Sequence, residues 1–432
     1  MSRTGSNYSN RDLHSLIPGG AHTYSRGQDQ FPRNAPKLLV KGKRIEVWAN
    51  DGRKFLDMTM GLRSVSIGHA ENSQRRFINK HISTGVNLSL PTPLEFELAE
   101  RIIELIPSAE MVKFGKNGSD VTSAAVRLAR AYTGRDVVLR CKDNPFFSVN
   151  DWFIGDTPMN AGIPESVRNL TDNFNYGDIG SIEKKIQEHN RNIAAIILEP
   201  AGASQLSVPF LQALRQICDR EGIILIFDEI ISGFRYALGG VQEIAKVSPD
   251  LSTFGKAVAN GYPLSILAGR KEVMEIGGIK HTRDRVFLMS STFGPEKSGL
   301  AAAIWTINQM QKNNGIENNW VMAERMKLHF NEYSASLGLQ ERIRMEGDAI
   351  NPLLKLVDEN GIPSPKLRAT FLYETVEDGL LMNYIALSTR HREKFWRVYR
   401  EKVEASLNRV RKRLDDGKLE PVGIEPVFRR KN

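Results

Sequence analysis

The sequence predicts an α/β protein built on a largely parallel sheet. Between residues 45 and 315, short apolar runs alternate with amphipathic stretches, which is the pattern of βαβ units. Two of the runs, 194–198 (AAIIL) and 222–227 (GIILIF), are apolar throughout. This is typical of strands covered on both faces, although a short buried helix gives a similar pattern. The end of the chain differs, because it contains long amphipathic stretches such as 390–415.

The chain of 432 residues is long enough for two or three domains. We expect residues 1–45 to form an N-terminal arm and part of a small domain, because they are polar and interrupted by glycine and proline. Residues 46–315 would form the large domain, although their first segment could belong to the small one, and residues 316–432 the C-terminal small domain. A hydrophobic content of 41% and a charged content of 25% argue against a disordered, collagenous or coiled-coil chain.

The formal charge of +9 raises the question of a nucleic-acid or membrane partner. Basic residues gather near the end of the chain, but no glycines or stacking aromatics interleave with them as in an RNA-binding face, so a solvated helix face is favoured. Cys141 and Cys218 form no CxxC pair, the N-terminus is polar, and no apolar run of about 18 residues occurs. We therefore expect a cytoplasmic protein that acts on small molecules, without nucleic acid, membrane or metal.

A helix start follows the apolar segment 111–114 (MVKF). Gly118 and Ser119 lead into a stretch whose Val121, Ala124, Ala125, Leu128 and Ala131 fall on one helical face, and Gly134 closes it. Small polar residues at such a start can be a simple cap. They can also form an anion cradle, because free backbone N–H groups and the helix dipole favour a phosphate there.

Carboxylates close both apolar runs, Glu199 the first and Asp228 the second. Ligands of open α/β sheets gather beyond the carboxyl ends of the strands. Lys256 stands 28 positions after Asp228, in PDLSTFGK. A lysine on a turn is usually only solvated. A lysine able to form a Schiff base, a carboxylate at a strand end and a glycine-bearing helix start are nevertheless the parts that pyridoxal 5'-phosphate requires.

Elementary chemistry gives each part a role. Lys256 would hold the cofactor aldehyde as an imine and, once displaced by the substrate amine, move the Cα proton as base and acid. Asp228 would keep the pyridine nitrogen protonated, because an adjacent anion favours the charged form. Gly118 and Ser119 would receive the phosphate.

These segments carry a resemblance to a known family. PDLSTFGKAVANGYPLSILAGRKEVM, IILIFDEIISGFR and NGSDVTSAAVRLARAYTGRD, together with IGHA at 67–70 and the N-terminal GG, resemble the class III aminotransferases, and within them glutamate-1-semialdehyde 2,1-aminomutase and its relatives. The resemblance implies fold type I of the pyridoxal-phosphate enzymes, with a mainly parallel seven-stranded sheet in the large domain and a small α+β domain from both termini. It also implies a homodimer with shared active sites.

Further site residues are implied by the same resemblance. Ile230 matches the residue that packs on one face of the cofactor ring, and Thr292 the threonine that reaches the phosphate of the neighbouring subunit. Where the family has Tyr-His-Gly over the other ring face, this chain has Phe146, Phe147 and a serine, so Phe146 can still stack, unless both phenylalanines are core residues.

The segments that face the substrate in the family depart from its pattern. Three arginines are candidates for binding a substrate anion, and Arg63 is preferred over Arg26 and Arg235 because it lies in a loop that faces the substrate in relatives. Each could instead form a structural ion pair. Glu199 could pair with such an arginine or gate the second substrate.

The sequence thus predicts a pyridoxal-phosphate-dependent class III aminotransferase. An amino donor, for which glutamate is the first choice, would pass its amino group through the Lys256 Schiff base and a pyridoxamine phosphate intermediate to an aldehyde or ketone. One alternative is an aminomutase of the glutamate-1-semialdehyde type, which moves the group within one molecule. Another is a binding or regulatory protein that has lost catalysis and uses its basic C-terminus.

Overall fold

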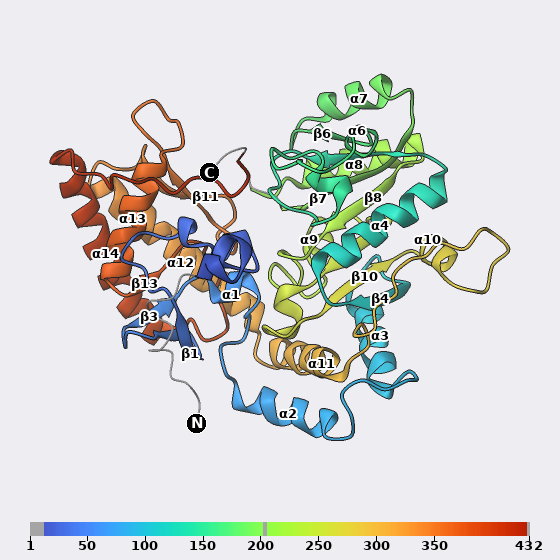
Figure 1. The fold of residues 1–432 in the computed structure, drawn as a ribbon, viewed down its shortest axis with the longest axis horizontal. Coiled ribbons are helices and arrows are strands. Elements are labelled where there is room, and N and C mark those ends of the chain that lie inside the picture. Colours follow the sequence, from blue (N-terminus) through green and yellow to red (C-terminus); the bar gives the residue numbers. More distant parts are fainter. Residues whose placement is uncertain (1–12, 202–204, 430–432) are drawn as a thin grey trace. The chain divides into compact units, whose positions relative to one another are not determined.

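The computed structural model describes residues 13–201 and 205–429, which divide into two compact units (Figure 1). The central unit is Asn72–Ile316, and the terminal unit joins residues 13–71 to 317–429. The segment 46–71, whose membership the sequence left open, groups with the terminal unit. Within the described residues, no helix is both long and apolar enough to cross a membrane.

Within the described residues, a seven-stranded sheet forms the core of the central unit. Its strands lie in the order β4-β10-β9-β8-β7-β5-β6. Its strands are β4 (Met111–Gly115), β5 (Val137–Cys141), β6 (Thr171–Phe174), β7 (Ile193–Leu198), β8 (Ile224–Asp228), β9 (Leu251–Phe254) and β10 (Ser265–Gly269). β10 runs antiparallel to both of its neighbours, and the other neighbouring pairs are parallel. The predicted fold class is confirmed.

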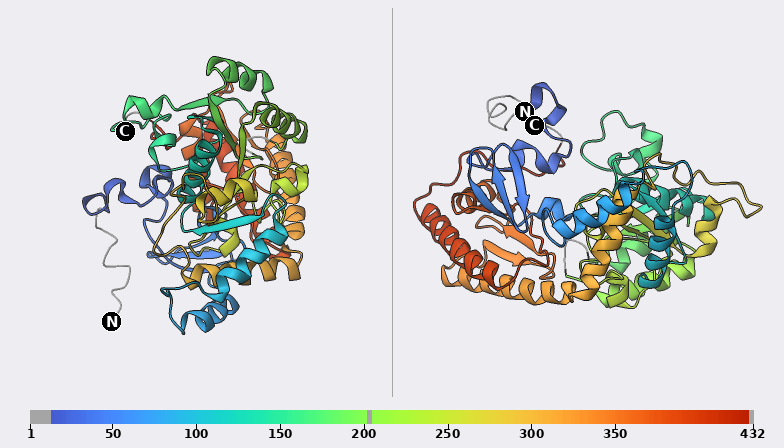
Figure 2. Two further views of the ribbon diagram at one scale, coloured as in Figure 1. Left: turned by 90° about the vertical axis from the view of Figure 1, so that its right-hand side faces the viewer. Right: turned by 90° about the horizontal axis from the view of Figure 1, so that it is seen from below.

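The helices of the central unit pack on this sheet or on one another (Figures 1 and 2). They are α2 (Asn72–Ile82), α3 (Pro93–Leu105), α4 (Gly118–Thr133), α5 (Asp151–Ile154), α6 (Glu165–Arg168), α7 (Ile179–Glu188), α8 (Val208–Glu221), α9 (Val241–Ala245), α10 (Lys271–Met274) and α11 (Lys297–Lys312), with the 3₁₀ turns η6 (Lys256–Ala259) and η7 (Glu275–Gly277). α4 packs against β10, β9, β8 and β7. It follows β4, which runs in the same direction as β9 because β10 is antiparallel to both, so the first turn of α4 lies at the carboxyl ends of the parallel strands.

The apolar runs of the sequence are strands because both faces of the sheet are covered. Every residue of β7 and of β8 is buried, and β8 includes Asp228 as its last residue. In α4, Val121 and Leu128 are buried as predicted, whereas Ala131 is exposed near the end of the helix. Gly134 is the C-cap with φ +67°, a left-handed conformation that glycine adopts without steric cost.

The terminal unit contains a sheet to which both ends of the chain contribute. Its four strands are ordered β1-β2-β3-β13, and β13 runs parallel to β3 with Leu380 opposite Leu56. The elements before residue 72 are η2 (Leu13–Ser15), η3 (Pro18–Gly20), η4 (Tyr24–Arg26), η5 (Gln28–Gln30), β1 (Leu39–Lys43), β2 (Glu46–Ala49), β3 (Lys54–Asp57) and α1 (Met60–Arg63). The later ones are α12 (Gly315–Ser336), β11 (Ile343–Glu346), β12 (Leu353–Leu356), α13 (Pro365–Glu377), β13 (Leu380–Leu381) and α14 (Glu393–Asp415).

Candidate active site

Asp228 lies at the carboxyl end of a central strand and is almost completely buried. Its Oδ1 accepts hydrogen bonds from the Ile230 backbone N–H at 3.0 Å and from the Thr253 hydroxyl at 3.1 Å. Burial raises the pKa of Asp228 to about 6, and these two hydrogen bonds and the charge of Lys256 offset that rise only in part. Among the described residues both hydrogen bonds end on Oδ1, so Oδ2 is the oxygen left for a bound N–H donor.

Lys256 begins the turn that follows the neighbouring strand β9. It is half-buried and has φ +42°, an uncommon conformation for a residue with a side chain. The Ile230 side chain lies between this turn and α4: a Cβ on Gly118 would meet Ile230 Cδ1 at 2.5 Å, and one on Gly255 would meet Ile230 Cγ2 at 3.6 Å. Glycines at these two positions let the strand end, the lysine turn and the helix start approach one another closely.

The first turn of α4 is capped at Asn117 and leaves donors for an anion. Asn117 and Asp120 form a capping box, in which the Asp120 carboxylate accepts from the Asn117 N–H at 3.0 Å. The Ser119 hydroxyl accepts a hydrogen bond from the Val149 N–H at 3.0 Å. A hydroxyl that accepts in this way keeps its own hydrogen to donate, and the first backbone N–H groups of a helix lack intrahelical acceptors.

The segment 145–150, which we call the aromatic loop, lies against the start of α4. Thr122 Oγ1 donates to the Phe147 carbonyl at 2.8 Å. Phe147 is buried at 1% exposure, whereas Phe146 is 43% exposed. The two alternatives for this loop therefore apply to different residues. Phe147 is a core residue, and the Phe146 ring remains accessible to a ligand.

The remaining predicted residues lie in different surroundings. Glu199 directly follows β7, is buried, and donates its backbone N–H to Asn144 Oδ1 at 2.9 Å. Thr292 is exposed, and its carbonyl accepts from Asn87 Nδ2 at 3.0 Å. Arg63 belongs to the terminal unit, at the end of α1, with its guanidinium 5.3 Å from the centre of the Tyr384 ring.

The two other arginine candidates are unlike each other. Arg26 is exposed in the terminal unit. Arg235 is buried in the central unit, where its Nε donates to the Ile231 carbonyl at 3.1 Å. The structure therefore brings together Gly118, Ser119, Asp228, Ile230 and Lys256, with Phe146 on a loop bound to the same helix.

Sequence reasoning missed two sets of residues around this site. Thr253, which bonds Asp228, stands opposite it in the parallel β8–β9 register. Lys116 donates to Glu296 Oε1 at 2.6 Å, and the Glu296 carboxylate also caps α11, so one ion pair links the segment before α4 to the start of another helix. Neither contact follows from spacing in the sequence, because each joins residues that only the tertiary fold brings together.

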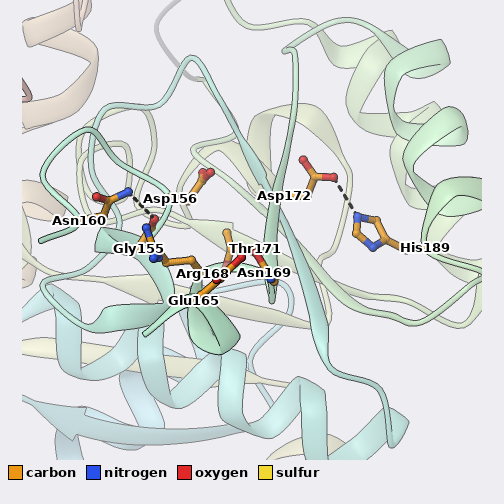
Figure 3. Close-up of a pocket in the computed structure, with 9 residues that line it drawn as sticks. All are labelled: Gly155, Asp156, Asn160, Glu165, Arg168, Asn169, Thr171, Asp172 and His189. Atoms are coloured by element: carbon orange, nitrogen blue, oxygen red, sulfur yellow. Dashed lines mark hydrogen bonds and ion pairs between the residues drawn. The ribbon is translucent and has the colours of Figure 1, made fainter. Parts of the chain in front are cut away.

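A polar pocket of about 600 Å³ occurs elsewhere in the central unit (Figure 3). It is lined by Gly155, Asp156, Asn160, Glu165, Arg168, Asn169, Thr171, Asp172 and His189. Asp172 Oδ2 accepts from His189 Nε2 at 2.8 Å, as the dashed line shows. The lining includes no residue that the sequence predicted to bind a cofactor or substrate, so this pocket is distinct from the candidate active site.

Comparison with known proteins identifies the family to which this chain belongs. The family model described as aminotransferase class III matches residues 25–410. The chain belongs to the class III aminotransferases. Among curated relatives, the 3-aminobutyryl-CoA aminotransferase of Cloacimonas acidaminovorans is 34% identical to this chain over 69% of the chain and 71% of the relative. The glutamate-1-semialdehyde 2,1-aminomutase of Chloroherpeton thalassium is 35% identical over 60% of the chain and 63% of the relative.

Several solved protein structures share the fold of this class III aminotransferase. The FumI protein of Sphingopyxis sp. MTA144, solved in its PLP form, superposes with a TM-score of 0.86 over 97% of this chain and 99% of that chain, at 23% identity. An omega-transaminase from Sphaerobacter thermophilus superposes with a TM-score of 0.85 over 94% and 97% of the two chains, at 22% identity. At such identities the likeness shows the fold, and it confirms the predicted fold type I architecture.

The residues of this aminotransferase fit pyridoxal phosphate, the cofactor of its family. Burial raises the pKa of Asp228 to about 6, and a protonated ring nitrogen beside Oδ2 would favour its carboxylate form. The helix start offers backbone N–H groups and the Ser119 hydroxyl to a phosphate. Pyridoxal 5'-phosphate, predicted from the sequence, is therefore confirmed as the cofactor at the level of the family.

Proposed function

We propose that this enzyme transfers an amino group from glutamate to a small aldehyde or ketone, with Lys256 as the residue that bonds the cofactor aldehyde. One observation carries the proposal: buried Asp228 ends β8, half-buried Lys256 begins the turn after the neighbouring parallel strand β9, and the Ile230 side chain packs between this turn and the start of α4. A ring-nitrogen partner, an amine and an anion cradle thus converge on one sheet edge. The sheet topology, with ligands at the carboxyl ends of strands, supports the same site.

Bound pyridoxal phosphate supplies an aldehyde that accepts the amino group and a ring that withdraws electrons from the substrate carbon. This chain's residues perform the remaining tasks. The Lys256 amine would take the proton from the substrate Cα as a general base and would return it, as a general acid, to the carbon that had been the cofactor aldehyde. Asp228 stabilises positive charge at the ring nitrogen because a carboxylate beside a cation lowers its energy.

Four further residues would hold the cofactor in place. Gly118 and Ser119 would bind the phosphate through the helix start and the hydroxyl. Ile230 would pack on one face of the ring and Phe146 on the other. For the substrate, Arg63 is the proposed partner of a carboxylate, and Glu199 the residue that pairs with it or admits the second substrate. These substrate roles rest on the resemblance to the family.

A homodimer with shared active sites is the second part of the proposal. The loop 84–90 and the segment 287–297 lie side by side, joined by hydrogen bonds from Lys297 N to the Val86 carbonyl at 2.9 Å and from Asn87 to the Thr292 carbonyl. Together they expose Val86, Leu88, Leu90 and Phe293, the last two by 78% and 62%. A second copy covering this apolar surface would bring Thr292 to the phosphate of its neighbour.

The basic C-terminal region supports a small-molecule enzyme over a nucleic-acid-binding protein. On α14, Arg409 pairs with Glu374 and Asp378, and Arg413 pairs with Glu374 and Glu420. These guanidinium groups are neutralised by the protein's own carboxylates, which leaves less charge for a phosphate backbone. Arg430 and Lys431, also part of the basic tail, lie outside the described residues.

An aminomutase remains the second candidate function, because glutamate-1-semialdehyde 2,1-aminomutases are among the relatives at 33–35% identity. The same cofactor residues would serve it. The two functions differ in one product: an aminotransferase releases a keto acid from its donor, whereas a mutase returns the amino group to the same molecule.

The first experiment is a visible absorption spectrum of the purified protein before and after adding glutamate, with 2-oxoglutarate assayed in the same tube. A band that bleaches as stoichiometric 2-oxoglutarate appears supports the aminotransferase. A band that glutamate leaves unchanged but that glutamate-1-semialdehyde alters supports the mutase. Lys256→Ala is the control: it should keep the cofactor without a covalent bond and lose turnover, and ordinary turnover in that variant would overturn the role of Lys256.

The dimer is tested by light scattering of the purified protein. Leu90→Asp together with Phe293→Asp should give a monomer with weakened cofactor binding. Val422→Asp, a change at another exposed apolar residue, is the matched control and should leave the dimer intact. A wild-type monomer with full activity would contradict the shared active site.

A further inference from the structure

The aromatic loop is tied to the start of α4 by hydrogen bonds at successive residues. Val149 N–H donates to Ser119 Oγ at 3.0 Å, and the Phe147 carbonyl accepts from Thr122 Oγ1 at 2.8 Å. Ser123 Oγ and Ser148 Oγ lie 3.0 Å apart. The helix that presents donors to an anion at its first turn therefore also fixes a loop through its first and second turns.

Ser123 is the centre of this network. Its hydroxyl oxygen accepts from Trp152 Nε1 at 2.8 Å and from Asn150 Nδ2 at 2.6 Å. Both of those groups are N–H donors, and a serine oxygen has two lone pairs, so they use its full capacity as an acceptor. The Ser123 hydrogen is consequently directed to Ser148 Oγ, which also accepts from the Asn150 backbone N–H at 3.1 Å. One hydroxyl thus fixes three side chains.

The network is buried, which makes it rigid. Ser123 is 8% exposed and Ser148 is fully buried, and the Trp152 indole is largely covered. Removing the Ser123 hydroxyl would leave the indole N–H without an acceptor in a place that water does not reach, which is costly. Hydrogen-bonded groups in such surroundings hold a single arrangement.

Phe146 lies next to the residues that this network holds. It is flanked by Pro145, whose ring fixes one backbone angle, and by Phe147, which is buried and hydrogen-bonded to Thr122. The Phe153 ring meets both phenylalanines edge-on, with centroid distances of 5.6 and 5.7 Å. The backbone of the loop is fixed on either side of the one aromatic ring that is exposed.

We propose that Ser123 is a positioning residue of the active site, which holds the aromatic loop on α4 so that Phe146 lies against the cofactor ring. The inference rests on the proposed function, because it requires Phe146 to contact the cofactor. Aromatic contacts depend on the angle and distance of the rings, so a loop freed by the loss of the hydroxyl would weaken them. Ser123 itself touches neither cofactor nor substrate in this proposal.

The test is a double-mutant cycle on the dissociation constant of pyridoxal phosphate, measured by titrating cofactor-free protein and recording absorbance. Phe146→Ala should raise the dissociation constant about 10-fold, which corresponds to a stacking contribution of about 1.4 kcal/mol. Ser123→Ala should raise it several-fold. In the double variant the constant should equal that of Phe146→Ala alone, because Ser123 acts through Phe146.

Three further variants separate positioning from general destabilisation. Ser108→Ala is the matched control: it removes another buried hydroxyl pair of the central unit, 3.1 Å from Ser252 Oγ, and should lower thermal stability without changing cofactor affinity. Trp152→Phe removes a single donor of the network and should give a smaller rise than Ser123→Ala. Ser123→Thr keeps the hydroxyl and should restore affinity.

The outcomes separate this inference from the proposed function. Equal effects of Ser123→Ala and Ser108→Ala on the dissociation constant, or full additivity with Phe146→Ala, would overturn the positioning role. A normal dissociation constant in Phe146→Ala would also overturn it while leaving the role of Lys256 intact. Failure of the wild-type protein to bind pyridoxal phosphate would instead defeat the proposed function.

Discussion

Two aspartates on the same sheet, Asp228 and Asp172, lie in opposite electrostatic surroundings. At Asp228 burial dominates and raises the pKa to about 6. At Asp172 burial also acts to raise the pKa, but hydrogen bonds from His189 and Lys185 outweigh it and hold the pKa below its usual value. The protein's own cations surround Asp172, whereas Asp228 is buried with fewer compensating charges, which is the pattern we expect if Asp228 binds a cationic group of a ligand.

The largest effect should come from removing the Asp228 charge. Asp228→Asn keeps the size of the side chain but withdraws the anion from the ring nitrogen, so we expect the rate of amino transfer to fall by about 100-fold or more. Asp172→Asn is the matched change on the same sheet and should leave that rate unaltered. Steady-state kinetics with saturating cofactor measure both, and an unchanged rate in Asp228→Asn would mean that another group serves the ring nitrogen.

The contributions of the two carboxylates to the free energy of unfolding should change with pH in opposite directions. The larger change is expected for Asp228. Its pKa in the folded protein lies above the unfolded value of 3.8, so its contribution to stability is fully present below 3.8 and is lost as the pH rises through about 6. The difference between these pKa values corresponds to about 3 kcal/mol. Cofactor-free Asp228→Asn should therefore gain stability relative to wild type between pH 4 and pH 7 in urea unfolding; a constant difference would contradict the raised pKa.

A smaller effect is expected where Ile230 meets α4. Gly118→Ala places a methyl group 2.5 Å from Ile230 Cδ1, so the isoleucine side chain must turn away from its proposed place against the cofactor ring. We expect the cofactor dissociation constant to rise roughly 5- to 10-fold, with no loss of thermal stability because alanine favours helix more than glycine does. Gly134→Ala, at the other end of the helix, is the control and should show the reverse: lower stability and normal affinity.

The smallest effect is predicted at Asp172. Asp172→Asn removes the charge that His189 and Lys185 share, which should reduce the free energy of unfolding by about 1 kcal/mol. Because the pKa of Asp172 is lowered in the folded protein, this stability is present above 3.8 and is lost as the pH falls through the lower folded value. Urea unfolding at pH 7 and at pH 3 measures the change, and an equal loss at both would contradict it.

The sequence was sufficient to predict those parts of the site that depend on residues close together in the chain. A continuous apolar run closed by a carboxylate predicted that Asp228 ends a buried strand, and small residues before a periodic stretch predicted the start of α4. Together with Lys256 these parts predicted the cofactor, the family resemblance supported it, and the family match confirmed it. The roles of the individual site residues remain predictions.

The contacts that support those residues could not be read from the sequence. The register that sets Thr253 beside Asp228 is decided by packing of the whole sheet, and the network at Ser123 depends on a loop that returns to α4 after β5. Phe146 and Phe147 are chemically identical neighbours, yet they differ in burial, at 43% and 1% exposure, and this difference alone separates an exposed ring from a core ring. Differences of this kind arise from tertiary structure alone.

The sheet shared by both ends of the chain has a consequence for synthesis on the ribosome. Leu56 of β3 pairs with Leu380 of β13, whereas the central unit is one continuous segment. At a translation rate of roughly 5 to 20 residues per second, β3 is made roughly 16 to 65 s before its partner strand. The segment that contains Asp228 and Lys256 is therefore complete, and able to collapse around its own sheet, while the terminal unit still lacks the strand that closes it.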